Sequence, residues 1–188
     1  MRVVGGRFKG RPLAGPRSNA IRPTSDRMRE SLFNILAHGY GFPDEGTRVL
    51  DLFAGTGALG LEAISRGAAS ALFFDTGVEA RALIRQNIES LGLTGVARIF
   101  RRDATKAGLA GTIAPFDLVF CDPPYRKGLG EKALNGITAG KWITSGALCV
   151  VEEAADMNFS VPSNFKLFDR RTSGETQIFF LKYFAEDR

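Results

Sequence analysis

From residue 48 onward, short apolar runs alternate with stretches of helical periodicity, and this alternation limits the chain to very few folds. Five runs have the length and composition of buried parallel strands, and three helical stretches lie between them. Two parallel strands need a crossover connection, so each intervening helix has to pack on a face of the sheet. The expected strands are 48–53, 69–75, 97–101, 117–121 and 147–152, and the expected helices are 58–66, 78–91 and 130–139.

Two more apolar runs, 166–171 and 175–184, stand at the end of the chain with only Thr172-Ser173-Gly174 between them. That gap is too short for a helical crossover, so the two strands are expected to pair as an antiparallel hairpin. The predicted fold class is therefore α/β, a Rossmann-like, doubly wound, mostly parallel sheet of about seven strands that ends in this hairpin. Sheets of this kind bind their ligands at the carboxyl ends of the strands.

Ahead of the sheet, residues 1–30 form a basic arm. They carry eight Lys or Arg side chains and only two acidic ones, whereas the rest of the chain holds 17 basic and 18 acidic residues. Glycines and prolines in the arm favour an irregular, mobile segment over a packed one. Clustered basic side chains neutralise phosphates and release counterions, although a solvated tail is the simpler interpretation. The expected substrate-binding residues are Arg7, Lys9, Arg11, Arg22 and Arg27.

The spacing of Met28, Leu32, Ile35 and Leu36 predicts a helix over 26–37, so the arm passes into the main domain, expected over residues 31–188. Only two cysteines occur, both in apolar runs, which argues against a disulfide scaffold and for a reducing compartment. No apolar stretch approaches the roughly 18 residues of a membrane span. Because the N-terminal residues also lack a signal-peptide core, we expect a cytoplasmic protein, and a monomer.

A glycine-rich loop follows the first expected strand. Gly55, Gly57 and Gly60 match the dinucleotide-binding spacing, and glycines there let the backbone approach a ligand closely. A pyrophosphate would favour bare helix-terminal amides. Asp51, four residues before the first of these glycines, instead suits a cationic partner. The loop therefore predicts a nucleoside ligand that carries positive charge and no phosphate.

Three carboxylates end three successive expected strands. Asp51 suits the ammonium and sulfonium groups of S-adenosylmethionine, Asp75 suits its ribose diol, and Asp103 is placed to meet its adenine amino group. Each one alone could be a cap or a solvated loop residue, but together they describe a nucleoside-plus-cation site. We therefore expect S-adenosylmethionine as the cofactor, held by Asp51, Gly55, Gly57, Asp75 and Asp103.

The fourth expected strand ends in Asp122-Pro123-Pro124-Tyr125. Consecutive prolines fix the backbone and remove two donors, which leaves carbonyl groups free to face a ligand. The Asp122 carboxylate and the Pro123 carbonyl can both accept hydrogens from a base amino group and so localise its lone pair, with Asp122 also a possible proton acceptor. Tyr125 would stack on a base swung out of its helix or loop. Asp122, Pro123 and Tyr125 are the expected catalytic residues, and no metal is expected.

The segments Asp51-Leu52-Phe53-Ala54-Gly55-Thr56-Gly57 and Asp122-Pro123-Pro124-Tyr125 resemble the amino-methyltransferase branch of the S-adenosylmethionine enzymes. More narrowly, residues 4–11, 22–27 and 29–36 resemble the RsmD family, and the similarity extends over essentially the whole chain, including the closing hairpin. That family comprises 16S ribosomal RNA guanine-N2 methyltransferases, which are often labelled DNA methylases. The resemblance implies a guanine N2 amino group as the target, in ribosomal RNA that is free, in the small subunit or in an assembly intermediate.

The sequence departs from the family pattern at two positions. Asp75 stands where a longer Glu is expected, so its reach to a ribose is shorter by one methylene. Cys121 replaces a larger aliphatic residue, and we expect it to be a small core residue, not a thiol nucleophile.

Other functions fit part of the sequence. A DNA adenine-N6 methyltransferase can use the same tetrapeptide, but 188 residues leave little room for a separate domain that reads duplex DNA. An NAD-binding oxidoreductase leaves residues 122–125 unexplained, and a non-catalytic RNA-binding module has no need of Asp122. Methylation of a free amino acid or a protein glutamine is conceivable, although enzymes of that kind usually carry Asn in place of Asp122.

Overall fold

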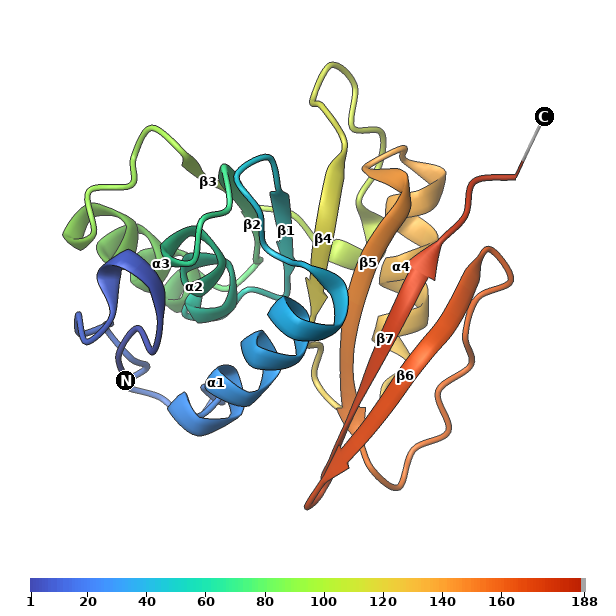
Figure 1. The fold of residues 1–188 in the computed structure, drawn as a ribbon, viewed down its shortest axis with the longest axis horizontal. Helices are drawn as coiled ribbons and strands as arrows, with labels where there is room; N and C mark the ends of the chain where they lie inside the picture. The colour runs from blue at the N-terminus through green and yellow to red at the C-terminus, as the bar shows by residue number, and fades with distance from the viewer. Residues whose placement is uncertain (187–188) are drawn as a thin grey trace.

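The computed structural model describes residues 1–186 and contains one seven-stranded sheet in the order β3-β2-β1-β4-β5-β7-β6 (Figure 1). The first five strands are parallel, and β7 pairs antiparallel with both β5 and β6. This confirms the α/β fold class, the mostly parallel sheet and the closing hairpin. The strands are β1 (Arg48–Leu52), β2 (Ser70–Phe74), β3 (Ala97–Phe100), β4 (Phe116–Cys121), β5 (Ile143–Ala154), β6 (Phe165–Ser173) and β7 (Thr176–Tyr183).

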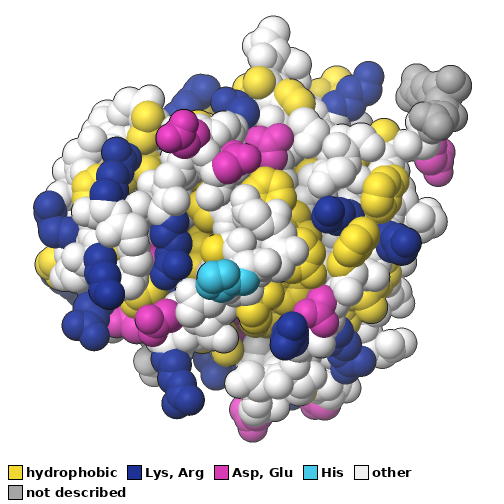
Figure 2. Space-filling model, in the orientation of Figure 1, with side chains coloured by type: hydrophobic (Ala, Val, Ile, Leu, Met, Phe, Trp, Pro, Cys, Tyr) yellow, Lys and Arg dark blue, Asp and Glu magenta, His cyan; other side chains and the backbone are white. Residues whose placement is uncertain are grey.

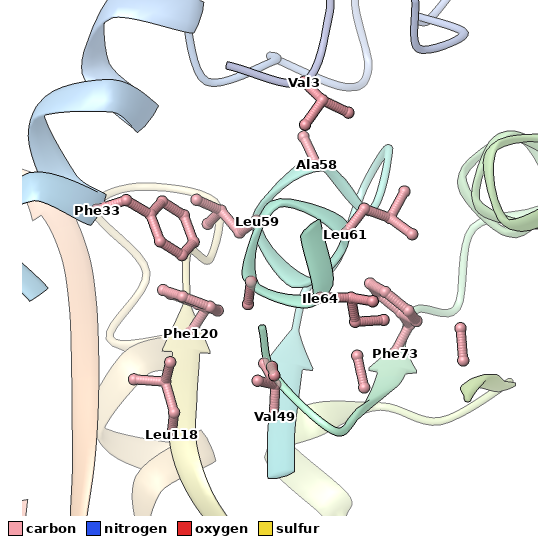
Figure 3. Packing of buried hydrophobic residues seen from close by; sticks show 14 of the residues in the cluster. Val3, Phe33, Val49, Ala58, Leu59, Leu61, Ile64, Phe73, Leu118 and Phe120 are labelled. Atoms are coloured by element: carbon pink, nitrogen blue, oxygen red, sulfur yellow. The ribbon is translucent and has the colours of Figure 1, made fainter. Parts of the chain in front are cut away.

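Helices cover both faces of the sheet, as crossover connections require. One face carries α1 (Asp26–Ile35), α2 (Ala58–Ser65) and α3 (Val78–Ser90), and the other carries α4 (Leu129–Ala139) with the short turn η3 (Ala104–Lys106). Side chains of β1 alternate between the two cores: Val49 packs on the α2 side, and Leu50 on the α4 side. Figure 3 shows the first core, where α2 lies between the sheet and the N-terminal segment. Phe33 of α1 points toward Phe120 of β4 in the same view.

Several boundaries differ from those that periodicity predicts. The helix expected over 26–37 ends as α-helix at Ile35 and continues as a π-helical turn, η2 (Leu36–Tyr40), which stacks Tyr40 on Phe180 of β7. Strand β5 starts four residues early because Ile143 pairs with Phe116 before a register shift. The hairpin turn is tighter than expected, since Ser173 pairs with Thr176 across Gly174 and Glu175. Within residues 1–186, no helix is both long and apolar enough to cross a membrane.

The first part of the basic arm is packed against the body of the protein, and the expectation of a mobile segment is wrong there. Residues 1–13 fold back on themselves, with the amide of Val3 donating to the Arg11 carbonyl at 2.9 Å and that of Gly10 donating to the Val3 carbonyl at 2.8 Å. Val3 and Leu13 are buried in the core with α2 and α3. Two apolar anchors and a few backbone bonds hold this segment, and such a pattern shows no periodicity that a sequence reading could detect.

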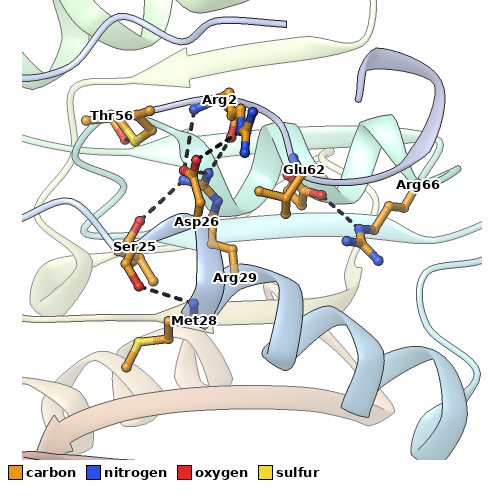
Figure 4. Close-up of polar contacts among 11 residues, drawn as sticks. Arg2, Ser25, Asp26, Met28, Arg29, Thr56, Glu62 and Arg66 are labelled. Atoms are coloured by element: carbon orange, nitrogen blue, oxygen red, sulfur yellow. Dashed lines mark hydrogen bonds and ion pairs between the residues drawn. The ribbon is translucent and has the colours of Figure 1, made fainter. Parts of the chain in front are cut away.

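Buried polar side chains of α1, α2 and α3 form hydrogen bonds to the backbone of the same segment. The amide of Val4 donates to Glu62 of α2 at 3.0 Å, and the amide of Ala14 donates to the Asn87 side chain of α3 at 2.7 Å. Glu62 also pairs with Arg66 at 2.8 Å (Figure 4). Arg29 of α1 is fully buried and donates to the Arg2 carbonyl and, at 2.7 Å, to Asp26 (Figure 4). The domain boundary expected after residue 30 therefore falls inside a helix that is tied to the arm.

Gly6 provides a test of this packing. It adopts φ +73°, and a Cβ there would overlap the carbonyl of Ser65, whereas Gly10 adopts φ +85° with open space around it. Both substitutions by Ala incur the left-handed backbone cost of about 1–2 kcal/mol, but only Gly6→Ala also adds the clash. We expect Gly6→Ala to expose residues 3–14 to hydrogen exchange and to lower the melting temperature well below that of the Gly10→Ala control. Equal exchange in the two variants would contradict the packing.

Candidate active site

A cavity of about 670 Å³ opens at the carboxyl ends of the parallel strands, where the order of the sheet reverses between β1 and β4. Its walls come from the loops that follow β1, β2, β3 and β4, and from the ends of β5 and β7. Residues 20–25 of the arm line one side of it. The turn between β6 and β7 and the start of α1 both lie at the lower edge of Figure 1, on the side of these strand ends. The cavity is where the sequence predicted the ligand to bind.

Asp51 lies at the inner wall of the cavity and is almost fully buried. Its Oδ2 accepts a hydrogen bond from the Gly60 amide in the first turns of α2 at 3.0 Å. A Cβ at Gly60 would collide with the ring of Phe73, so only glycine lets α2 come this close to the carboxylate. Burial raises the pKa of Asp51 to about 8, and the nearby charge of Asp75 adds to the rise. An ionised Asp51 is therefore costly unless a cation binds beside it.

Asp75 and Asp103 follow β2 and β3 at the same edge and also line the cavity. Asp75 accepts hydrogen bonds from the amides of Gly55 at 2.9 Å and Gly77 at 2.8 Å, one on each oxygen, so it braces the glycine loop. Asp103 accepts through Oδ1 from the Thr105 amide and hydroxyl, which lowers its pKa. Carboxylate oxygens have spare lone pairs beyond these bonds. Each residue can thus accept ligand hydrogens without giving up its structural contact.

The glycines of the loop have different surroundings. Gly55 adopts φ +59° and lines the cavity, where a Cβ would touch Ile21 of the arm at 3.3 Å. Gly57 adopts φ +79° at the start of α2 and does not line the cavity; a Cβ there would meet Ile84 and Phe73 at 3.3 Å. Gly57 therefore shapes the turn that leads into α2 from outside the cavity.

Asp122, Pro123 and Tyr125 form the opposite wall, in the loop that follows β4. No side-chain hydrogen bond engages Asp122 among residues 1–186, and the residue lines the cavity. Burial raises the pKa of Asp122 well above its usual range, and the charges of Glu152 and Asp51 raise it further, while Arg22 opposes them. A carboxylate with a raised pKa is a better proton acceptor than an exposed one.

Two residues that the sequence analysis did not single out hold Tyr125. Its hydroxyl donates to Glu152 near the end of β5 and lies 3.1 Å from the hydroxyl of Thr176 at the start of β7. Both partners line the cavity. Glu152 is the last residue of the strand expected over 147–152, so the rule that selected Asp51, Asp75 and Asp103 also applies to it. The same rule does not point to Thr176, because β7 runs antiparallel to β5 and Thr176 stands at its amino end.

The five basic residues expected to bind substrate fall into two groups. Arg22 lines the cavity, where its charge lowers the pKa of both Asp122 and Glu152. Arg7, Lys9, Arg11 and Arg27 are exposed and lie outside the cavity. Arg11 donates to the Ser90 carbonyl of α3 at 2.8 Å, and Arg7 lies 4.7 Å from the Phe8 ring centroid. The structure therefore brings Arg22 to the expected catalytic residues and leaves the other four on the surface.

Comparisons with known proteins identify the family. A family model described as "Conserved hypothetical protein 95" matches residues 1–182. The chain is 39% identical over 178 residues to ribosomal RNA small subunit methyltransferase D of Escherichia coli strain K12, covering 93% of this chain and 86% of that one. It is 32% identical over 176 residues to the protein of the same name from Haemophilus influenzae, covering 93% and 89%. The chain belongs to the RsmD family.

The structural comparison agrees with this assignment. A solved structure of the Escherichia coli protein yhhF, described as a methyltransferase, superposes with a TM-score of 0.82 at 34% identity and covers 99% of both chains. The chain is therefore a methyltransferase, and the relatives support the RNA methyltransferase prediction over the DNA alternative. Cys121 and Cys149 are free and buried in the core, as expected for small core residues.

The raised pKa of Asp51 makes a prediction about stability. Because the folded pKa of about 8 exceeds the ordinary value of 3.8, the folded state binds more protons than the unfolded state between these limits, and stability falls as pH rises. Asp51→Asn keeps an acceptor for Gly60 and removes this loss. We expect the variant to gain stability relative to wild type from pH 5 to pH 8, by on the order of 1 kcal/mol per pH unit, in urea titrations.

Asp103→Asn is the control for this measurement. Hydrogen bonds lower the pKa of Asp103, so it stays ionised in both states from pH 5 to pH 8. The stability curve of this variant should run parallel to that of wild type over that range. A parallel curve for Asp51→Asn as well would mean that Asp51 ionises normally in the folded protein.

Proposed function

We propose that this methyltransferase transfers the methyl group of S-adenosylmethionine to the N2 amino group of a guanine in small-subunit ribosomal RNA. The observation that carries the proposal is the position of Asp122 and Pro123, which face the same cavity as Asp51, Asp75 and Asp103. A donor site and an acceptor site for a base amino group thus share one space. The name of the relatives supports ribosomal RNA of the small subunit as the substrate class.

The donor set fits S-adenosylmethionine. Asp51 has one oxygen held by Gly60 and the other without a hydrogen-bond partner in the part of the chain that the structure describes, so a cationic group can pair with it. Asp75 would accept from the ribose diol through lone pairs that Gly55 and Gly77 leave open, and Asp103 from the adenine amino group through Oδ2. When bound, the cofactor supplies a methyl group on a positively charged sulfur.

The chain's own residues then have to prepare a poor nucleophile. An amino nitrogen on a purine shares its lone pair with the ring, and two acceptors on its hydrogens pull it toward tetrahedral geometry. Asp122 and the Pro123 carbonyl would be those acceptors, and Asp122 would also take the proton that the nitrogen loses. Tyr125 would hold the ring of the base by stacking. Alignment of the nitrogen with its target supplies much of the acceleration.

The basic surface would bind the RNA backbone. In Figure 2, Lys and Arg side chains gather on the left of the molecule, over the part that Figure 1 shows as the N-terminal segment, α2 and α3. Arg7, Lys9 and Arg11 belong to this segment and are exposed. We propose that they contact phosphates, which sets affinity without reading sequence. Arg22, inside the cavity, would act on the target base.

Asp122→Ala tests the chemistry. It should abolish methyl transfer from labelled S-adenosylmethionine to small-subunit ribosomal RNA while cofactor affinity, measured by calorimetry, stays within about threefold, because Asp122 acts mainly in the transition state. Asp156→Ala, which removes an exposed carboxylate paired with Arg126, is the control and should retain activity. Digestion of wild-type product should yield N2-methylguanosine. Recovery of N6-methyladenosine, or near wild-type turnover in Asp122→Ala, would overturn the proposal.

Replacing Arg7, Lys9 and Arg11 together by Ala tests the RNA surface. If all three contact phosphates, the slope of log affinity against log salt should flatten by about two to three units, and the apparent KM for RNA should rise. Cofactor affinity should not change, since none of the three lines the cavity. Replacing Arg98, Lys106 and Lys132, on the side of the sheet that α4 covers, is the matched control and should preserve the slope. An unaltered slope in the first variant would place the RNA surface elsewhere.

A further inference from the structure

Glu152 presents a second carboxylate to the cavity beside Asp122. It stands two residues before the end of β5, next to β4 in the sheet, and the two strands pair in parallel up to Cys121 and Val151. Asp122 and Glu152 are therefore the next residues on adjacent strands. Both line the cavity, and the charge of Glu152 acts on Asp122.

One oxygen of Glu152 is already in use. Tyr125 donates its hydroxyl to Oε1, and Thr176 lies beside the same hydroxyl at 3.1 Å. Oε2 has no hydrogen-bond partner among residues 1–186, so an acceptor remains available beside the group that would hold the target nitrogen. Burial raises the pKa of Glu152, whereas the hydrogen bond from Tyr125 and the charge of Arg22, also in the cavity, oppose this rise and favour the charged form, which can only accept hydrogen bonds.

Which base this acceptor favours depends on the hydrogen-bond donors and acceptors at the edge of the base. In guanine, the N2 amino group is adjacent to N1–H, so two neighbouring positions donate. In adenine, the N6 amino group is adjacent to N1, which accepts. Two acceptors side by side therefore match guanine, and they place a lone pair against a lone pair in adenine. A buried polar group left unpaired is strongly disfavoured, so this arrangement discriminates well.

We propose that Glu152 determines specificity, with Oε2 accepting the N1 hydrogen of guanine while Asp122 and the Pro123 carbonyl hold its N2 amino group. Oε1 keeps Tyr125 in position for stacking at the same time. This inference rests on the proposed function, because it assigns the residue that reads the base on which that function acts. It goes further by explaining why the same tetrapeptide would choose guanine in this chain.

The test uses 2-aminopurine, which keeps the C2 amino group of guanine but has a hydrogen-bond acceptor at N1. Two RNAs are prepared, one with guanine and one with 2-aminopurine at the nucleotide that the wild-type protein modifies. We expect wild type to prefer guanine by at least about 100-fold in kcat/KM, since 2-aminopurine leaves Glu152 unpaired. In Glu152→Gln, the amide can accept from Tyr125 and donate to N1 of 2-aminopurine. The preference for guanine should therefore fall at least about tenfold in this variant.

Two control variants separate base reading from support of Tyr125. Tyr125→Phe and Thr176→Val break the hydroxyl contacts of Tyr125 but leave Oε2 of Glu152 in place, so both should lower the rate on the two RNAs alike and keep the ratio of wild type. If Glu152→Gln also lowers both rates equally, Glu152 only supports Tyr125, and the inference is overturned while the proposed function stands. If wild type forms no N2-methylguanosine on the guanine RNA, the proposed function itself fails.

Discussion

The reversal of strand order between β1 and β4 is the constraint on which the rest of the structure depends. Parallel strands need crossovers, and the crossovers from β1 and β4 leave the sheet in opposite directions, to α2 on one face and to α4 on the other. The loops that follow β1 and β4 therefore diverge, and the sheet leaves a space between them. The cavity is the consequence of this topology. The side chains that we propose to bind the cofactor and the target base all line it.

The protein uses this space to hold several carboxylates close together. Asp51, Asp122 and Glu152 all have raised pKa values because burial disfavours their charge. The charge of a neighbouring carboxylate raises each of these pKa values further. Arg22 opposes this for the latter two. The electrostatic free energy of such a site is unfavourable when the site is empty, and bound cations and hydrogen-bond donors make it favourable. Part of the binding free energy therefore comes from relief of the repulsion between the carboxylates. Functional sites commonly reduce stability in this way.

Sequence reasoning predicted the parts of the protein that follow periodic rules. Alternating runs and helical spacing gave the sheet and its helices to within a few residues, and the carboxyl-end rule located Asp51, Asp75, Asp103 and Asp122 at one cavity. It failed where the contacts are single and non-local. Val3 and Leu13 are isolated apolar residues among basic ones, and their burial against α2 and α3 depends on tertiary packing. Thr176 reaches the cavity from the amino end of β7 and Ile21 from the arm, so the carboxyl-end rule points to neither.

The packing of the N-terminal segment also has a consequence for the order in which the chain can fold. Val4 bonds to a residue 58 positions later, Ala14 to one 73 positions later, and Arg11 to one 79 positions later. During synthesis these residues leave the ribosome well before α2 and α3 exist, so Val3 and Leu13 stay exposed to water until about ninety residues have emerged. Contacts this distant are slow to form, because chain entropy is lost before they can compensate. The segment that comes first in the chain can thus take its native place only after α2 and α3 have formed.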